Sequence, residues 1–270
     1  MAAIEPDESF RDFLYEVSAP LWRDMPWRDD TRPYYVIVSE LMLQQTQVAR
    51  VVPKFQEFIT HFPDELVLAN ASLADVLTLW QGLGYNRRAK FLHQSAKMIV
   101  SEFGGEFPHG VADILRLPGV GKNTLGAILA YAYNTPSIFV ETNIRTVYIH
   151  HFFADDFAVD DKQIIALLEA TIDHENPRAF YQSLMDYGSW LKGQGVHNIA
   201  QSLHYKKQSP LKGSVREVRG QIIKVLGTGR QTESTLRNIL NADERFEVAL
   251  SDLIHEGLVS EADGQLQLAD

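Results

Sequence analysis

Helical periodicity is the feature that most constrains the fold of this 270-residue chain. Up to about residue 205, apolar residues recur at intervals of three and four, which places them on one face of an α-helix. Short runs rich in glycine, proline, asparagine and aspartate separate the periodic segments. The expected helices span 10–17, 36–58, 73–80, 88–103, 111–117, 123–133, 143–153, 161–172 and 177–191. We therefore expect an all-α core with short connections.

The pattern changes after residue 207. Residues 208–214 are rich in serine, lysine, proline and glycine, which is typical of a linker. Three further helices are expected at 215–226, 233–240 and 243–256, followed by a β-hairpin at 257–268 that turns at Asp263-Gly264. This order predicts a small winged-helix-like α+β module, with a packing or dimerising appendage as the alternative. The third helix is acidic, which is unfavourable for binding in a DNA major groove.

Composition excludes several classes of site. The chain has no cysteine, so disulfides, thiolate zinc sites and cysteine-ligated iron–sulfur clusters are excluded. His150 and His151 lack the spacing of a metal site, and we expect no bound metal. No apolar run approaches the roughly 18 residues of a membrane span, and the N-terminus lacks a basic and then apolar signal segment. We therefore expect a cytoplasmic protein without a membrane partner.

The distribution of charge is more informative than its total. A net charge of -10 is unfavourable for binding nucleic acid, because lysine and arginine supply most of the non-specific affinity for phosphates. Between residues 187 and 230, however, Glu217 is the single acidic residue. The basic residues of the same segment are Lys192, Lys206, Lys207, Lys212, Arg216, Arg219, Lys224 and Arg230. A basic segment is thus embedded in an acidic chain.

Residues 117–122, Leu-Pro-Gly-Val-Gly-Lys, predict a site for a phosphate group. A Pro-Gly-x-Gly turn that opens a helix presents a concave row of backbone N–H groups. Glycine matters there because a side chain would hold the phosphate away from the backbone. We therefore expect this turn to bind a nucleic-acid backbone, and the carboxylate of Glu141, which follows it in the chain, suggests chemistry nearby.

A second carboxylate, Glu40, lies in a segment expected to be helical. Its neighbours Ile37, Leu41 and Leu43 are apolar, and apolar surroundings raise the pKa of a carboxyl group, as a general acid requires. The alternative is a carboxylate on the exposed side of the helix. The polar residues 44–47 that follow either contact base edges or face solvent.

Six motifs occur in the order and spacing of one protein family. They are Pro26-Trp-Arg28, Pro33-Tyr-Tyr35, Ser39-Glu-Leu-Met-Leu-Gln-Gln-Thr-Gln-Val48, Trp80-Gln-Gly-Leu-Gly-Tyr85, Leu117-Pro-Gly-Val-Gly121 and Met185-Asp-Tyr-Gly188. In these motifs the chain resembles the helix-hairpin-helix DNA glycosylases over residues 20–190, and it is most similar to their adenine DNA glycosylase branch.

The resemblance implies a two-lobed all-α core. Residues 1–30 and 136–210 would form one helical lobe, and residues 31–135 would form a helical barrel lobe that holds the hairpin. The winged-helix-like module would then occupy residues 211–270.

The resemblance also implies roles for the two carboxylates. Glu40 matches the general acid that protonates the departing purine, and Glu141 matches the carboxylate that stabilises the cationic sugar. The adenine branch has aspartate at the second position, so Glu141 is longer by one methylene. This departure indicates either a re-tuned pocket or weakened catalysis, because a misplacement of about 1 Å can cost roughly a hundredfold in rate. Asn143 matches the asparagine that organises the sugar pocket.

Asn123 bears on the type of reaction. Related bifunctional enzymes have a lysine at this position, whose amine attacks the sugar and forms a Schiff base. Asparagine cannot form this bond, and the adjacent Lys122 points about 100° away around the helix. The resemblance therefore implies a monofunctional enzyme that leaves an abasic site.

Further residues match DNA contacts of the family. Tyr85 matches an aromatic wedge that enters the base stack, with core packing as the alternative, and Gln44 matches a residue that fills the space of the flipped nucleotide. Gln45, beside it, is a further expected contact. Arg87, Arg88 and Lys90 are expected to bind phosphates near the wedge. The remaining expected contacts belong to the hairpin and are Leu117, Gly119, Val120, Gly121, Lys122 and Asn123.

Two features of the family are missing. The four cysteines that hold an iron–sulfur cluster are absent, and we expect packing of Trp190, Leu191, Leu203 and Tyr205 to replace it. No cofactor is expected, although the hairpin leaves room for a monovalent cation. Residues 211–270 are also fewer than, and differ in pattern from, the C-terminal domain that recognises 8-oxoguanine in typical adenine glycosylases, which argues against adenine opposite 8-oxoguanine as the expected substrate.

The expected function is a monofunctional DNA glycosylase of base excision repair, acting as a nucleoid-associated monomer on double-stranded DNA. It would flip out a damaged or mispaired base, with an adenine-type purine favoured. One alternative is a damaged or mispaired pyrimidine, such as uracil, thymine opposite guanine or 5-hydroxymethyluracil. The other alternative is a non-catalytic protein that binds lesions.

Overall fold

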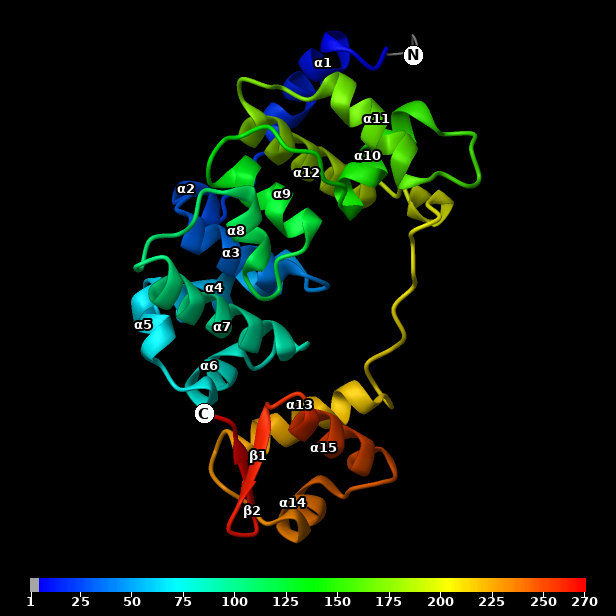
Figure 1. Cartoon of the computed structure of the whole chain (residues 1–270). Helices are drawn as coiled ribbons and strands as arrows, with labels where there is room; N and C mark the ends of the chain where they lie inside the picture. Colours follow the sequence, from blue (N-terminus) through cyan, green and yellow to red (C-terminus); the bar gives the residue numbers. More distant parts are fainter. Residues whose placement is uncertain (1–4) are drawn as a thin grey trace. The chain divides into compact units, whose positions relative to one another are not determined.

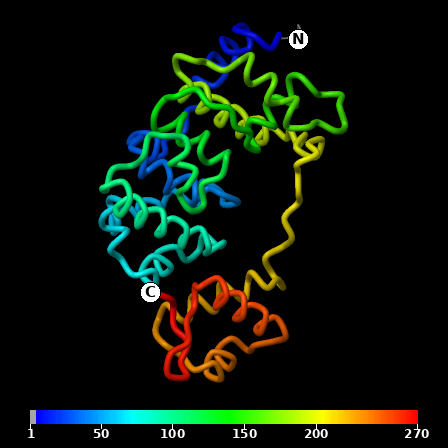
Figure 2. The backbone as a smooth tube through the Cα atoms, in the orientation of Figure 1, coloured from blue at the N-terminus to red at the C-terminus, as the bar shows by residue number. Residues whose placement is uncertain are grey.

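The computed structural model describes residues 5–270 and is mostly helical (Figures 1 and 2). The contacts between Cα atoms divide it into two units, residues 1–36 with 121–207, and residues 37–120 with 208–270. The elements of the first unit are α1 (Glu8–Ser18), η1 (Ala19–Leu21), α2 (Pro26–Asp29), α9 (Lys122–Tyr131), α10 (Thr142–Phe152), α11 (Asp161–Thr171), α12 (Pro177–Gly193) and η2 (Asn198–Gln201). Helix α3 (Pro33–Leu43) crosses the division between residues 36 and 37.

The second unit contains the remaining elements. Its helices are α4 (Val48–His61), α5 (Glu65–Asn70), α6 (Leu73–Trp80), α7 (Arg87–Glu102), α8 (Val111–Arg116), α13 (Val215–Leu226), α14 (Glu233–Leu240) and α15 (Arg245–His255), and its strands are β1 (Val259–Ala262) and β2 (Gln265–Leu268). No helix within residues 5–270 is both long enough and apolar enough to cross a membrane.

Helix α12 is the centre of the first unit. It packs against both α1 and α10. The apolar faces of these helices share one core, in which Phe10, Tyr148 and Phe180 have no exposed surface. This amphipathic packing follows from the helical periodicity of the sequence and confirms the expected all-α core.

The expected helix over residues 36–58 is wrong as a single element. The structure has two helices, α3 and α4, and the chain turns between them at residues 44–47. Gln45 adopts the left-handed conformation, with φ of 55°, which a continuous helix does not allow. Apolar spacing alone did not indicate this break, because the spacing continues on both sides of it. The short helices α2 and α5 were also not expected.

Arg88 stabilises this break. Its side chain is 6% exposed, and its guanidinium Nη1 donates hydrogen bonds to the carbonyl oxygens of Leu41, Met42 and Gln44 at 2.6, 2.9 and 2.5 Å. Its Nη2 donates to the carbonyl oxygens of Leu83 and Gly84 at 3.2 and 2.9 Å. The bonds from Nη1 satisfy carbonyl groups at and just after the end of α3, and those from Nη2 hold the loop before α7. Burial also lowers the pKa of Arg88 to about 10.

The three helices and the hairpin expected after residue 214 are present. Helices α13, α14 and α15 precede the antiparallel hairpin of β1 and β2, which turns at Asp263 and Gly264 with φ of 53° and 70° (Figure 2). A bridge between Gln231 and Leu266 extends the hairpin towards α14. Within the second unit, α13 and β2 pack against α6.

The observed units divide the core at residues 36 and 120, whereas sequence analysis placed these boundaries at 30 and 135. The second boundary lies earlier because α9 packs against α12 and so groups with the first unit. The division into two core lobes and a module at 211–270 stays a proposal.

Replacement of Arg88 by alanine should lower the free energy of unfolding by about 3 kcal/mol or more, because several buried carbonyl groups would lose a charged donor. The matched variant Arg87→Ala removes a neighbouring arginine that is exposed and lies over the Phe91 ring. Chemical denaturation of both variants tests this prediction. Equal losses for the two would contradict the structural role of Arg88.

Candidate functional site

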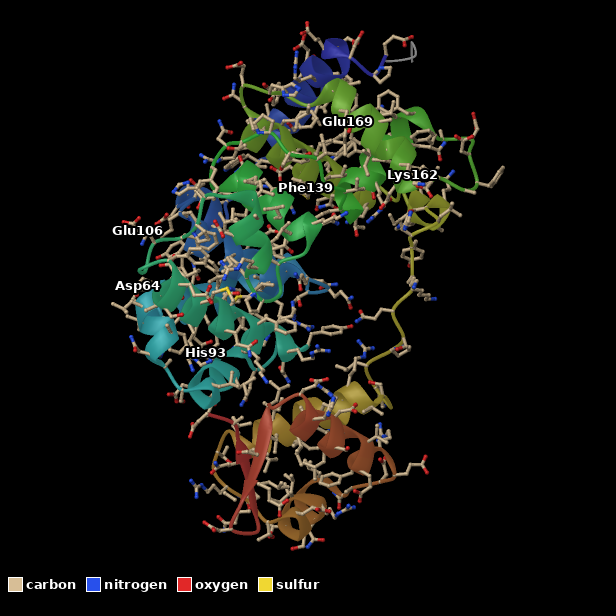
Figure 3. All side chains as sticks on the ribbon, in the orientation of Figure 1. Asp64, His93, Glu106, Phe139, Lys162 and Glu169 are labelled. Carbon is tan, nitrogen blue, oxygen red and sulfur yellow. The ribbon has the colours of Figure 1, made fainter. Side chains whose placement is uncertain are left out.

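Glu141 lies directly before α10, at the end of an extended segment that is held on both sides. The Ser137 hydroxyl donates to the Gly126 carbonyl oxygen of α9 at 2.7 Å, and the Tyr181 hydroxyl of α12 donates to the Ser137 carbonyl oxygen at 2.6 Å. The Phe139 ring stacks on the Tyr181 ring at 4.1 Å between centroids (Phe139 is labelled in Figure 3). The backbone that leads to Glu141 is therefore fixed by two helices.

Asn123 adds a direct contact to this segment. Its Nδ2 donates a hydrogen bond to the carbonyl oxygen of Val140 at 2.9 Å, and Val140 is the residue before Glu141. Sequence analysis considered Asn123 only as the residue that replaces a lysine. The structure shows that its amide joins the first turn of α9 to the approach of α10.

The side chain of Glu141 makes no hydrogen bond that caps α10, although the residue occupies the N-cap position. The residue is half-buried, and burial raises the pKa of its carboxyl group, while the positive charge of Arg145 opposes this effect. Arg145 is held by Asp161, to whose two carboxylate oxygens it donates at 2.8 and 2.7 Å. The site thus contains a partly desolvated carboxyl group near a fixed cation.

Asn143 lies in the first turn of α10 and faces α12. Its Nδ2 donates to the Met185 carbonyl oxygen at 3.2 Å. Its Oδ1 is buried and accepts no hydrogen bond from the residues that the structure describes. A buried acceptor without a partner costs roughly 1–3 kcal/mol. A bound ligand that carries a donor would remove this cost.

Gly188 permits the close approach of α12 to this turn. A methyl group at residue 188 would lie 2.5 Å from the Asn143 carbonyl oxygen and 2.9 Å from its Cβ. A methyl carbon does not approach other atoms this closely, so no larger residue fits without moving α10. The glycine of the Met185-Asp-Tyr-Gly188 motif therefore has a packing role next to Glu141.

Asp186 lies on α12 beside Met185, and sequence analysis gave it no role. It is 3% exposed, and Arg28 donates to its two carboxylate oxygens at 2.8 and 3.0 Å. Arg23 also donates to it, at 2.5 Å, and to the Met185 carbonyl oxygen that Asn143 contacts. The sequence signal was available, because Asp186 and Arg28 belong to two of the six motifs. These ion pairs join the segment before α3 to the helix that supports α10.

Glu40 lies in the second unit, near the C-terminal end of α3. Its neighbours Ile37 and Leu41 are 1% and 0% exposed, whereas Glu40 itself is half-buried. These apolar neighbours are therefore buried, and the role of Glu40 stays a prediction. Such a carboxyl group is suited to donate a proton to a bound ligand.

The turn between α8 and α9 has the expected conformation. Gly119 has φ of 82°, and a methyl group there would lie 2.9 Å from Cβ of Phe91, so glycine is required for two reasons. The Val120 N–H donates to the Leu117 carbonyl oxygen at 3.1 Å, which closes the turn. The Ser95 hydroxyl of α7 donates to the Pro118 carbonyl oxygen at 2.8 Å.

The residues of this turn divide into two groups. Leu117 and Val120 are 1% and 8% exposed, so their side chains hold the turn in place and only their backbone remains for a ligand. Gly121, Lys122 and Asn123 are exposed, and Gly121 gives α9 an N-terminus without a side-chain cap. Exposed N–H groups at a helix N-terminus favour an anion.

Arg88 was expected to bind a phosphate near the wedge, and the structure corrects this expectation. Its guanidinium is buried and bonded to backbone carbonyls, so it has no surface for a phosphate group. Arg87 is exposed. Tyr85 is 36% exposed and has φ of 49°, so core packing does not explain it. Gln44 is half-buried and Gln45 is exposed.

The comparisons with known proteins agree with these motifs. Residues 38–172 match the model of the HhH-GPD superfamily base excision DNA repair protein. The chain is 34% identical over 271 residues to the adenine DNA glycosylase of Mycolicibacterium smegmatis, and the alignment covers 92% of both proteins. The chain belongs to the HhH-GPD superfamily. It is also 39% identical over 171 residues to the adenine DNA glycosylase of Buchnera aphidicola subsp. Baizongia pistaciae. This alignment covers 62% of the present chain and 48% of the Buchnera protein.

This HhH-GPD protein therefore spans about half the length of the Buchnera relative that it matches. Solved structures share its fold. A thermostable thymine-DNA glycosylase has a TM-score of 0.58 at 24% identity, over 66% of this chain and 86% of the other. A trapped endonuclease III–DNA intermediate has a TM-score of 0.57 at 18% identity, and the match covers 74% of this chain and 86% of the other. These likenesses confirm the expected fold class.

The iron–sulfur cluster implied by the resemblance does not fit this HhH-GPD protein, because its sequence offers no thiolate ligand. The segment after α12 is held instead by amide side chains. Asn198 donates to the Thr146 carbonyl oxygen at 2.9 Å, and Gln201 donates to the Asp156 carbonyl oxygen at 2.8 Å. Within residues 5–270, no group of three or more histidine or acidic side chains is placed to hold a metal ion.

The expected packing in place of the cluster is wrong for three of its four residues. Leu191 is buried, but Trp190, Leu203 and Tyr205 are 44%, 61% and 47% exposed. The Trp190 ring stacks on the Tyr187 ring, with 5.9 Å between their centroids. Hydrogen bonds to backbone carbonyls, which the apolar pattern did not indicate, provide the attachment.

Replacement of Gly188 by alanine should destabilise the protein by about 1–3 kcal/mol, because the methyl group overlaps the first turn of α10. Gly193→Ala on the same helix is the matched control, since no atom lies within 4 Å of the added methyl group. Thermal unfolding compares the two variants. A Gly188→Ala protein as stable as Gly193→Ala would contradict the close approach of the helices.

Proposed function

We propose that the protein is a monofunctional DNA N-glycosylase of base excision repair that removes adenine from double-stranded DNA and leaves an abasic site. The observation that carries this proposal is the placement of Glu141. Asn123, Ser137 and Asn143 fix the backbone around it, yet its carboxyl group is not used to cap α10. A carboxyl group with a fixed backbone and no capping hydrogen bond is suited to stabilise a cation.

The proposed reaction uses two carboxyl groups in different protonation states. Glu40 donates a proton to the purine, so the base departs as a neutral molecule with the electrons of the glycosidic bond. The sugar then carries the positive charge, which the ionised Glu141 stabilises. A water molecule adds to the sugar carbon and releases a proton to solvent, and the Glu40 carboxylate takes up a proton from solvent, which restores the starting state.

The raised pKa of Glu141 is consistent with this assignment. Burial makes the ionised carboxylate less favourable in the resting protein, and the same low polarity strengthens its attraction to a cationic sugar. In the transition state, attraction to the cationic sugar offsets the cost of burying the Glu141 carboxylate. Asn143 would support the pocket, because its buried Oδ1 can accept a hydrogen bond from a bound ligand.

Binding to DNA is assigned to exposed groups. The N-terminus of α9 with Gly121 and Lys122 would bind a backbone phosphate, and Arg87 would bind another. Tyr85, also exposed, would enter the base stack, and the half-buried Gln44 would fill the space left by the flipped nucleotide. All proposed steps use side chains and water, so we propose no cofactor, and we propose a cytoplasmic, nucleoid-associated monomer.

Adenine is proposed on the basis of the relatives. The M. smegmatis protein carries the name adenine DNA glycosylase and aligns with this chain over 92% of both lengths. The shortness of that module therefore does not argue against adenine. The thymine-DNA glycosylase shares the fold but does not support a pyrimidine substrate at 24% identity.

Replacement of Glu40 or Glu141 by glutamine should reduce base release by a factor of about 100 or more, because each change removes an ionisable group from the reaction. Binding to the duplex should change little. The test is single-turnover release from duplexes with one adenine opposite guanine, 8-oxoguanine, cytosine or thymine, scored as alkali-labile sites. Further duplexes carry uracil, thymine opposite guanine or 5-hydroxymethyluracil.

Glu169→Gln is the control, since Glu169 is exposed on α11 (Figure 3). It should release the base at the wild-type rate. Wild-type rates for Glu40→Gln or Glu141→Gln would exclude the two-carboxylate reaction. Binding without release from any duplex by the wild-type protein would favour the non-catalytic alternative.

Borohydride reduction during the reaction should trap no covalent protein–DNA complex, because Asn123 has no amine to form a Schiff base. Alkali-labile sites in the same samples provide the positive control for base loss. A trapped complex would disprove the monofunctional assignment. Its loss in Lys122→Ala would then identify Lys122 as the nucleophile.

A further inference from the structure

The hydroxyl of Tyr85 is bound by residues of the C-terminal region. Nη1 of Arg216, on the first turn of α13, donates to this hydroxyl at 2.6 Å, and the Gln208 amide contacts the same oxygen. Gln208 also donates to Oε1 of Gln45 at 3.2 Å. Residues that precede and begin the module thus contact two exposed residues with left-handed backbones, Gln45 and Tyr85.

Arg216 is itself fixed. Its Nη2 donates to the carbonyl oxygen of Ser209 at 2.7 Å and to the Ser209 hydroxyl at 3.2 Å, so the guanidinium joins Ser209 to Tyr85. The guanidinium carbon lies 5.5 Å from the centroid of the Tyr85 ring. A planar group with several donors can hold such a geometry, whereas an ammonium group cannot bind both partners in the same way.

The module that carries Arg216 is attached to the same unit as Tyr85. Lys90, on α7 beyond Tyr85, donates from Nζ to the Glu256 carbonyl oxygen at the end of α15, at 2.5 Å. Helix α13 packs against α6, the helix before the Tyr85 loop. The module that carries Arg216 is therefore held against the helices on both sides of the Tyr85 loop.

We propose that Arg216, assisted by Gln208, is a positioning residue that holds the exposed Tyr85 ring in the conformation needed to enter the base stack. The inference rests on the proposed function. A left-handed backbone is unfavourable for tyrosine, and an exposed ring has several rotamers. The charge-assisted bond to its hydroxyl selects one of them before DNA binds. The C-terminal module is then a part of the base-flipping apparatus.

The test measures base flipping and base release separately. A duplex with 2-aminopurine beside the target base reports unstacking by fluorescence, and single-turnover kinetics reports the maximal rate and the enzyme concentration at half-maximal rate. Arg216→Ala and Tyr85→Phe each remove the bond and should lower both the fluorescence change and the maximal rate by about tenfold. The half-saturating concentration should change less than twofold. Combining both changes should give no further loss.

Two further variants separate positioning from charge. Arg216→Lys keeps the charge but cannot donate to Ser209 and Tyr85 together, so it should recover only part of the rate. Lys162→Ala removes an exposed positive charge on α11 (Figure 3) and should behave as the wild type. Full recovery with Arg216→Lys would overturn the proposal in favour of a simple contact with phosphate.

Other results would also overturn the inference. Unchanged or faster release by Arg216→Ala would show that the contact is neutral or inhibitory. Multiplied losses in the double variant would show that Arg216 acts independently of the Tyr85 hydroxyl. A wild-type protein that releases no base from any duplex would disprove the proposed function instead, and the fluorescence measurement would still decide whether Arg216 positions Tyr85.

Discussion

The close contact between α12 and the first turn of α10 determines where Glu141 lies. Gly188 allows it, because a methyl group there would overlap the Asn143 backbone. The same stretch of α12 carries the buried Asp186, which binds Arg23 and Arg28, and Met185, whose carbonyl accepts from both Arg23 and Asn143. A buried carboxylate that loses its partners is strongly destabilising. The ion pairs therefore secure α12, and through it they secure the start of α10.

This arrangement leaves two groups in unfavourable environments. The Glu141 carboxyl group is partly desolvated, and Asn143 Oδ1 is buried without a donor within the described residues. Natural proteins tolerate such costs mainly where function requires them. Both groups lie within one helical turn, and both would gain from a cationic or hydrogen-bonding ligand. The well-packed surroundings supply the stability that compensates for this turn.

In the second unit, two arginines serve structural purposes that their charge does not indicate. Arg88 is buried and satisfies the carbonyl groups at the end of α3, so it supports the loops that contain Gln45 and Tyr85. Arg216 approaches Tyr85 from the C-terminal module. A positive charge near an expected DNA surface therefore does not by itself identify a phosphate contact. Burial and hydrogen-bond partners separate Arg87, which is exposed, from Arg88.

Local patterns in the sequence determined most of the helical elements, the Pro-Gly-x-Gly turn and the C-terminal hairpin, because helix periodicity and turn conformation depend on residues near one another in the chain. The roles of the two carboxylates stay predictions from the motifs. The tertiary structure decided the break at Gln45, the burial of Arg88, the bond from Asn123 to Val140 and the contact between Arg216 and Tyr85. Each depends on groups far apart in the sequence or on a backbone conformation that apolar spacing does not encode. Only the folded chain brings these groups within hydrogen-bonding distance.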